Sequence, residues 1–328
     1  MQTLRKPQAF LRRLASLRRS AVCLSFAFVA ACSAWAAPQI GGTIAFVQAT
    51  AGRYEVHVVE AGSNDARRVW REDGVIFDVS LSPDGQRVAF DTGGNLYIVN
   101  VDGNGHTQVT NFGGGERAAG SAWSPDGSRL AYGSRATLVD TTLSVVNQDG
   151  GDPRVLLQMP PGYLGDVAWS PRGGEIAYTK PTGGHSLNME LFGVATGDTT
   201  VLTNVGGYNL AWSPDGTQLA FTRGTEVADR MEIFAMWVPP NEEPRRIAET
   251  QVWSGRSLSW IDPDHIAHLS ADDAQMIHIT DLEGNAEAPL AVGATGDIGS
   301  FDWVDPARAV RPAGKLATTF GRLKAGDA

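Results

Sequence analysis

Residues 122–132 read AWSPDGSRLAY, and residues 211–221 read AWSPDGTQLAF. The tetrapeptide Ser-Pro-Asp-Gly occurs a third time at 82–85, and degenerate copies stand at 170–173, 261–264 and 304–306. The residue before each copy is large and apolar and recurs at intervals of 42 to 48 residues, giving six marker positions: Leu81, Trp123, Trp169, Trp212, Trp260 and Trp303. A period of this length indicates propeller blades or a solenoid.

The residues that follow each tetrapeptide distinguish these two architectures. Each of the five complete repeats continues with an apolar residue, an alanine and a ring, as in Val88-Ala89-Phe90. A β-rich run such as Leu96–Val99 comes next, and a short segment such as Thr200–Thr203 closes the unit. Together with the inner strand that ends at the marker, each repeat therefore predicts four short strands separated by turn residues. Four strands per repeat are typical of a propeller blade.

The tetrapeptide itself is explained by turn chemistry. A type I turn favours Ser at its first position, Pro at the second and Gly at the fourth. Proline presets the backbone angle, and aspartate bonds the backbone of its own turn. We therefore interpret the motif as the turn between the innermost strand and the next, with no catalytic role.

Both ends of the chain are expected to share one blade. Ile44-Ala45-Phe46, Tyr54–Val59 and Ala66–Trp70 resemble the second, third and fourth strands of a blade that has no first strand. Ser300–Trp303 resembles a first strand with no others behind it. We predict that these segments form a sixth, composite blade, because closing the ring removes two bare sheet edges.

The 328 residues, 42% of them apolar, are expected to contain one all-β domain, a six-bladed propeller over residues 43–304. Residues 1–36 contain no acidic residue, and six basic residues precede the apolar run 21–31, which is the layout of an export signal. Two processing sites compete: cleavage after Ala36, or a lipoprotein signal over 1–31 with Cys32 as the lipidated first residue. The expected location is the periplasm, with a possible outer-membrane lipid anchor through Cys32.

Charge limits the classes of partner. The net charge of −9 becomes about −15 once the basic signal is removed, so a nucleic-acid partner is not expected.

Both cysteines lie in the signal, and no run in the mature part approaches the ~18 apolar residues of a membrane span. The tail 305–328 contains five basic residues and is expected to be disordered. We expect the mature chain to be a monomer.

A set of residues three positions before the markers is polar at five of its six members. It comprises Asp78, Gly120, Asp166, Asn209, Ser257 and Ser300. Equivalent positions on six inner strands form a ring around the axis, and its oxygen atoms suit a hard cation such as Ca²⁺. The alternative is a hydrated channel rim without a bound ligand. We keep Asp78, Asp166, Asn209, Ser257 and Ser300 as candidates for a ligand or cation site; a metal remains unassigned.

The sequence contains no strong catalytic motif: Gly-x-Ser-x-Gly and His-Glu-x-x-His are both absent. We therefore expect a non-enzymatic binding module. The alternative is an enzyme in the axial channel, a carbohydrate lyase or hydrolase or a peptidase-like protein, acting on a sugar or peptide.

The pattern Ala-Trp-Ser-Pro-Asp-Gly, followed by apolar-Ala-aromatic and a strand ending near Asp-Gly, resembles the WD40-like repeats of the TolB family of periplasmic propellers. The resemblance covers about residues 43–304 and includes the composite closing blade. It implies six blades, a periplasmic location, binding of an envelope protein such as a Pal-like lipoprotein, and a cation in the channel. TolB proteins carry an N-terminal α/β domain that engages TolA, whereas about seven residues here separate the predicted cleavage site from the first strand. Only the role of the propeller is therefore expected to carry over.

Overall fold

The computed structural model describes residues 41–113, 115–135, 141–160, 166–183, 186–204, 206–225, 230–240, 242–250 and 256–307. All of them belong to the unit Pro38–Ala328. The predicted export signal with Cys32, and the predicted tail from residue 308 onward, lie outside the described residues. No helix in the described ranges is long and apolar enough to cross a membrane.

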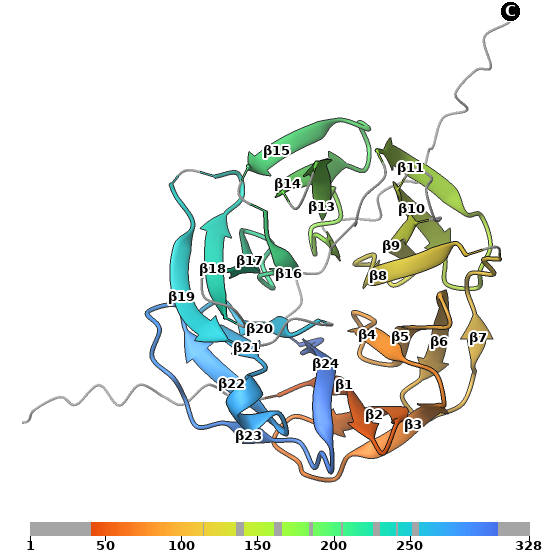
Figure 1. Ribbon diagram of the computed structural model, residues 1–328, viewed down its shortest axis with the longest axis vertical. Coiled ribbons are helices and arrows are strands. Elements are labelled where there is room, and N and C mark those ends of the chain that lie inside the picture. Colours follow the sequence, from red (N-terminus) through yellow and green to blue (C-terminus); the bar gives the residue numbers. More distant parts are fainter. Residues whose placement is uncertain are drawn as a thin grey trace, which may run out of the picture. The chain divides into compact units, whose positions relative to one another are not determined.

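The described chain forms six four-stranded antiparallel sheets arranged as the blades of a β-propeller (Figure 1), as the repeats predict. Two blades comprise β4 (Ile76–Leu81), β5 (Arg87–Thr92), β6 (Asn95–Asn100) and β7 (Thr107–Gln108), then β8 (Arg117–Trp123), β9 (Arg129–Arg135), β10 (Thr141–Asn147) and β11 (Arg154–Met159). The next two comprise β12 (Val167–Trp169), β13 (Glu175–Gly183), β14 (Ser186–Gly193) and β15 (Thr199–Thr203), then β16 (Tyr208–Trp212), β17 (Gln218–Gly224), β18 (Met231–Trp237) and β19 (Arg245–Thr250). The fifth comprises β20 (Leu258–Asp262), β21 (His265–His268), β22 (Met276–Asp281) and β23 (Leu290–Ala291), with a short 3₁₀ helix, Ala271–Asp273, before β22.

The sixth blade is built from both ends of the described chain, as predicted. Its strand order is β24-β1-β2-β3, with β24 (Asp297–Val304) innermost, followed by β1 (Thr43–Thr50), β2 (Arg53–Glu60) and β3 (Arg67–Glu72). The register aligns Phe301 with Phe46 and Trp303 with Ile44. These two cross-strand pairs of large apolar side chains join the two ends of the described chain and so close the ring of blades.

The Ser-Pro-Asp-Gly turns have the predicted local structure. In the turn at 124–127 the Gly127 N–H donates to the Ser124 carbonyl at 2.8 Å, and Gly127 has a φ of +67°. The Ser124 hydroxyl donates to Asp126 at 2.6 Å and accepts from the Arg129 N–H at 3.0 Å. Asp126 also accepts from the Ser128 N–H at 3.0 Å. The serine, the aspartate and the glycine of the motif therefore each have a role within their own turn.

The apolar core lies between the blades. Six clusters of buried side chains are present in the described structure, and each combines residues of two neighbouring blades. The marker tryptophans strengthen these junctions. Trp123, Trp212 and Trp260 each donate their indole N–H across a blade boundary, to the carbonyls of Ser80, Ala168 and Ala211 at 3.0, 3.1 and 3.0 Å.

Candidate functional site

The residues of the predicted polar ring come together, but as pairs of neighbours. The Ser300 hydroxyl donates to Asp78 at 3.1 Å, and the Asn209 N–H donates to the Asp166 carboxylate at 2.5 Å. Ser257 is 2% exposed, and its hydroxyl has no partner in the described structure. Each pair joins two adjacent inner strands, so these contacts hold blades in register around the axis.

Two ring positions also need an unusual backbone. Gly120 and Asn209 have φ values of 60° and 56°, and each lies where the pairing of its inner strand with the next shifts by a residue. Glycine and asparagine are the residues that tolerate this left-handed conformation at a β-bulge. The chemistry of the ring is therefore partly set by the geometry of the strands.

Asp91 on β5 binds the backbone of the ring residue Asp78. The sequence pattern did not predict this role. Its Oδ1 accepts the N–H groups of Asp78 at 2.8 Å and Phe77 at 3.2 Å. Burial raises the pKa of Asp91 to about 7, and the nearby Asp78 charge adds to the rise despite these two donors. Burial likewise raises the pKa of Asp166 to about 6, against the N–H of Asn209.

Arg256, immediately before the ring residue Ser257, brings a positive charge to the axis. Its Nη2 donates to the Ser121 carbonyl at 2.6 Å, and its Nε lies 3.6 Å from Asp78 Oδ1. Although burial opposes it, the carboxylates of Asp78, Asp302 and Asp166 raise the pKa of Arg256. The guanidinium is therefore a permanent cation whose charge is stabilised by three nearby carboxylates.

Asp302, one position before the marker Trp303, is a further charged group of the site, and Asp305 also lines the space beside it. Its Oδ2 accepts the Leu81 N–H at 2.8 Å from the neighbouring blade, and its Oδ1 accepts the Trp303 N–H at 3.0 Å. The Ser259 hydroxyl lies 3.4 Å from the same Oδ1. Burial raises the pKa of Asp302, while the charge of Arg256 and the Leu81 N–H lower it. Backbone donors thus fix the orientation of this carboxylate.

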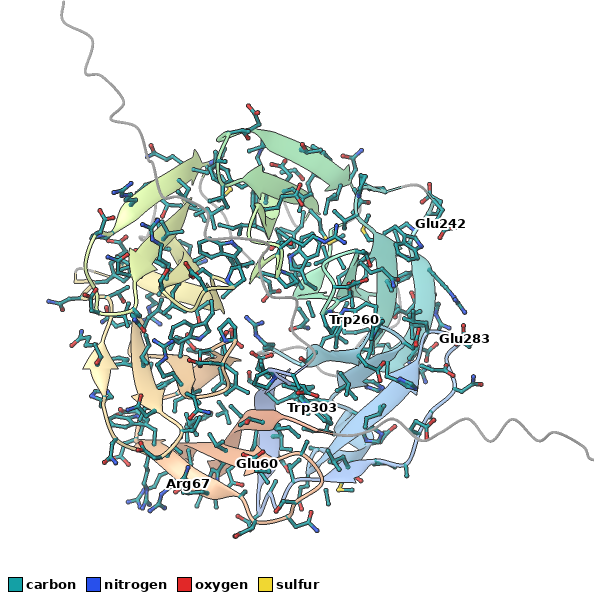
Figure 2. All side chains as sticks on the ribbon, turned by 180° about the vertical axis from the view of Figure 1, so that it is seen from behind. Glu60, Arg67, Glu242, Trp260, Glu283 and Trp303 are labelled. Atoms are coloured by element: carbon teal, nitrogen blue, oxygen red, sulfur yellow. The ribbon has the colours of Figure 1, made fainter. Side chains whose placement is uncertain are left out.

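A cavity of about 190 Å³ opens on the axis at the end where the Ser-Pro-Asp-Gly turns lie. We call it the turn-face cavity. Figure 2 shows Trp260 and Trp303 close to this axis, whereas Arg67, Glu242 and Glu283 lie toward the outside. Its wall contains the residues one position before each marker: Ser80, Ala122, Ala168, Ala211, Ser259 and Asp302. Small side chains at five of these six positions leave the space open.

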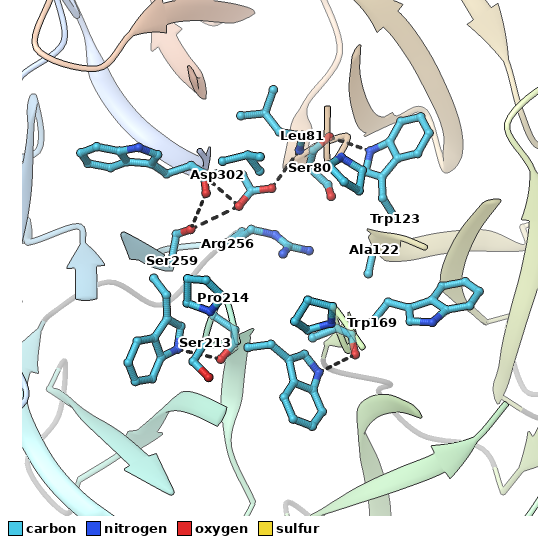
Figure 3. Close-up of a pocket in the computed structure, with 18 of the residues that line it drawn as sticks. Ser80, Leu81, Ala122, Trp123, Trp169, Ser213, Pro214, Arg256, Ser259 and Asp302 are labelled. Carbon is cyan, nitrogen blue, oxygen red and sulfur yellow. Dashed lines mark hydrogen bonds between the residues drawn. The ribbon is translucent and has the colours of Figure 1, made fainter. Parts of the chain in front are cut away.

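Prolines and indoles form the mouth of the turn-face cavity, and Arg256 lies inside it. The prolines come from four turns and the indoles from five markers: Pro83, Pro125, Pro171, Pro214, Trp123, Trp169, Trp212, Trp260 and Trp303. Figure 3 shows the Arg256 guanidinium extending into the middle of the space, with Asp302 and Ser259 on one side. The predicted ring residues do not line the cavity, because they lie deeper along the inner strands.

These observations bear on the predicted calcium site. In the described ranges, no group of three or more His, Cys, Asp and Glu side chains is arranged to hold a metal ion. The guanidinium of Arg256 supplies positive charge to the same carboxylates that the hypothesis assigned to the cation. Calcium binding stays a prediction, and any ion would have to compete with this charge.

Arg256 and Asp302 were not predicted, because the predicted ring comprised only the positions three before each marker. A signal for Asp302 was present in the repeats, since it is the single ionisable residue among the six residues that directly precede the markers. Arg256 carried no such signal. Its equivalents in other repeats include Phe77 and Tyr208, and only the folded structure shows that its side chain reaches the axis.

Comparison with known proteins places the fold. The model of the dipeptidyl peptidase IV N-terminal region matches residues 46–137. The structure of TolB from Acinetobacter baumannii is similar with a TM-score of 0.69 and 14% identity, over 80% of this chain and 66% of that one. A putative TolB from Agrobacterium tumefaciens has a TM-score of 0.55 and 19% identity, over 80% and 92% of the two chains.

A third similar structure is an enzyme. It is an oligogalacturonate lyase in complex with manganese, with a TM-score of 0.54 and 17% identity over 75% of this chain and 73% of that one. A comparison of the sequence with curated proteins found no match. At these identities the similarity concerns the fold. The resemblance to TolB propellers drawn from the repeats is confirmed at that level, and the protein is a six-bladed β-propeller with a TolB-like fold.

Proposed function

We propose that this protein is a non-enzymatic binding module of the bacterial cell envelope, and that its turn-face cavity receives a segment of a partner protein such as a Pal-like lipoprotein. The observation that carries the proposal is the cavity itself. It lies on the propeller axis, combines an apolar mouth with one central cation, and is built from equivalent positions of all six blades.

The size of the cavity supports a protruding protein segment as the ligand. Pockets that enclose a whole drug-sized molecule have volumes of roughly 300–1,000 Å³. About 190 Å³ suits one or two side chains that project from a partner. The four turn prolines and the half-buried Trp169 offer rigid apolar surface around this space, whereas the other marker indoles are at most 9% exposed and stabilise the blade junctions. A buried cation surrounded by such surface fits the centre of a protein interface, where arginine and aromatic residues are enriched.

The polar groups in the cavity support binding better than catalysis. Both oxygens of Asp302 are held by backbone N–H groups, and the hydroxyl of Ser213 donates to Asp215 at 2.7 Å within its own turn. The same serine–aspartate contact occurs in the turns at 82–85 and 124–127, so it belongs to the turn and does not mark Ser213 as an activated nucleophile. The predicted export signal supports a location in the periplasm.

An affinity experiment tests this proposal. The mature protein is immobilised and exposed to detergent-solubilised envelopes of the same bacterium, and retained proteins are identified and titrated individually. We expect a Pal-like lipoprotein to bind at micromolar concentration or below. Ala168→Leu, which fills the cavity wall, should weaken binding at least tenfold, whereas Val201→Ser on the exposed surface of β15 should not.

The folding of each variant is checked through its thermal transition, and Ala122→Leu replaces Ala168→Leu if the latter does not fold. Failure to retain any envelope protein would contradict the proposal. Equal binding by the wild type and the cavity-filled variant would place the interface elsewhere on the propeller. Turnover of oligogalacturonate or of a peptide by the purified protein would favour the enzymatic alternative.

A further inference from the structure

The guanidinium of Arg256 has more hydrogen-bond donors than the described structure uses. A guanidinium carries five N–H donors in a planar fork. The Arg256 guanidinium uses one of them in the described structure, from Nη2 to the Ser121 carbonyl at 2.6 Å. Its Nε is buried without a partner, and the 3.6 Å to Asp78 is too long for a hydrogen bond. The cation is therefore neutralised electrostatically while most of its donors remain available.

The surrounding carboxylates do not take up these donors, because they are engaged by other groups. Asp302 accepts the backbone N–H groups of Leu81 and Trp303. Asp78 Oδ1 accepts the Ser300 hydroxyl at 3.1 Å and the backbone N–H of Arg256 itself at 3.2 Å. These bonds orient the two carboxylates toward neighbouring backbone and hydroxyl groups, and neither forms a two-point pair with the guanidinium in the described structure.

The turn-face cavity gives a ligand access to Arg256. Arg256 lines the cavity, and its side chain is 13% exposed, so its contact with water is limited. Hydrogen bonds between a guanidinium and a carboxylate are strongest when they form two parallel contacts, and they gain strength where water is excluded. An acceptor group of the right size that enters from the mouth would therefore meet unused donors in a partly dry setting.

We propose that the turn-face cavity is a carboxylate-binding site, in which Arg256 binds the acidic side chain or the C-terminal carboxylate of an inserted peptide segment. This inference rests on the proposed function and specifies the chemistry of the partner's inserted group. The apolar mouth accommodates the methylene or backbone atoms that precede the carboxylate. The central guanidinium supplies the specificity, because a neutral amide of the same shape offers one acceptor oxygen and no charge.

Short peptides separate the two sources of the carboxylate. Acetyl-Gly-Asp-Gly-amide offers a side-chain carboxylate, and acetyl-Gly-Gly-Gly offers a C-terminal one. Acetyl-Gly-Asn-Gly-amide and acetyl-Gly-Gly-Gly-amide are their neutral controls. Binding to the mature protein is measured by NMR, from the shifts of the indole N–H signals and of the Arg256 Nε–H signal. We expect saturable shifts with at least one acidic peptide and at least tenfold weaker binding of its neutral control.

Variants of Arg256 test the role of the fork. Arg256→Gln should weaken binding of the acidic peptide at least tenfold, and Arg256→Lys, which keeps the charge but not the two-point geometry, should have an intermediate effect. Val201→Ser should bind as the wild type does. The comparison of acidic and neutral peptides uses the wild-type protein, so it decides the question even if an Arg256 variant does not fold.

Equal binding of acidic and neutral peptides, or no saturable shift with any acidic peptide, would overturn the proposal. A shift with calcium chloride that is reversed by a chelator, in the absence of any carboxylate effect, would overturn it in favour of a cation site. Carboxylate binding without retention of an envelope protein would contradict the proposed function alone. Retention of a partner that is insensitive to Arg256→Gln would contradict this inference alone.

Discussion

Replacement of Trp212 by phenylalanine tests whether the marker tryptophans join the blades. Trp212 is 9% exposed, packs in the cluster between the β12–β15 and β16–β19 blades, and donates its indole N–H to the Ala168 carbonyl at 3.1 Å. Phenylalanine keeps most of the apolar ring but removes this donor. Trp169 provides a matched control, because its indole N–H donates to Gly173 at 3.3 Å within its own turn.

The expected cost follows from these contacts. Loss of a buried hydrogen bond that leaves its acceptor without that donor destabilises a protein by about 1–3 kcal/mol. We therefore expect Trp212→Phe to lower the free energy of unfolding by that amount. Trp169→Phe should cost less than about 1 kcal/mol, because its bond is local and solvent reaches the half-buried ring. Trp212→Ala, which also removes the ring, should cost about 3–5 kcal/mol.

Equilibrium unfolding in urea measures these differences. A pure change in stability moves the midpoint and leaves the slope unchanged, whereas an altered slope would reveal that a blade unfolds separately. The reasoning would be refuted if Trp212→Phe were as stable as the wild type, or if Trp212→Phe and Trp169→Phe had equal effects. In either case the interblade hydrogen bond would not contribute to the stability of the ring.

Two further predictions concern a buried acid and the export signal. The folded-state pKa of Asp91 is raised to about 7 from 3.8, so the folded protein keeps a proton that the unfolded chain releases. Its contribution to stability is complete below about pH 4 and is lost as pH rises through about 7, on the order of 1 kcal/mol per pH unit. Asp91→Asn, which keeps an acceptor for Asp78 and Phe77, should flatten this dependence in unfolding curves measured from pH 4 to 8; an unchanged slope would refute the assignment. For the signal, palmitate labelling in the native host should mark the wild type and not Cys32→Ala if the lipoprotein site is used. An unlabelled wild type would leave cleavage after Ala36 as the processing route.

The repeats determined most of the fold because the decisive interactions are local. The turn at 124–127 depends on groups within five residues of one another, namely a serine hydroxyl, an aspartate and a glycine with positive φ. Its spacing therefore identifies the inner strands directly. The composite blade could also be predicted, since Ser300–Trp303 lacked outer strands and Ile44–Phe46 lacked an inner one. The boundaries differ slightly, as β3 begins at Arg67 and not at Ala66.

The candidate site was decided by the tertiary structure. Asp78 meets Ser300 across 222 residues of sequence and the Arg256 N–H across 178, so no local pattern records either contact. The sequence alone predicted which positions surround the axis, because equivalent residues of a closed ring must do so. It did not show which side chains reach the axis or which donors stay unused. Those properties depend on the distances between six inner strands, and these are fixed only when the ring closes.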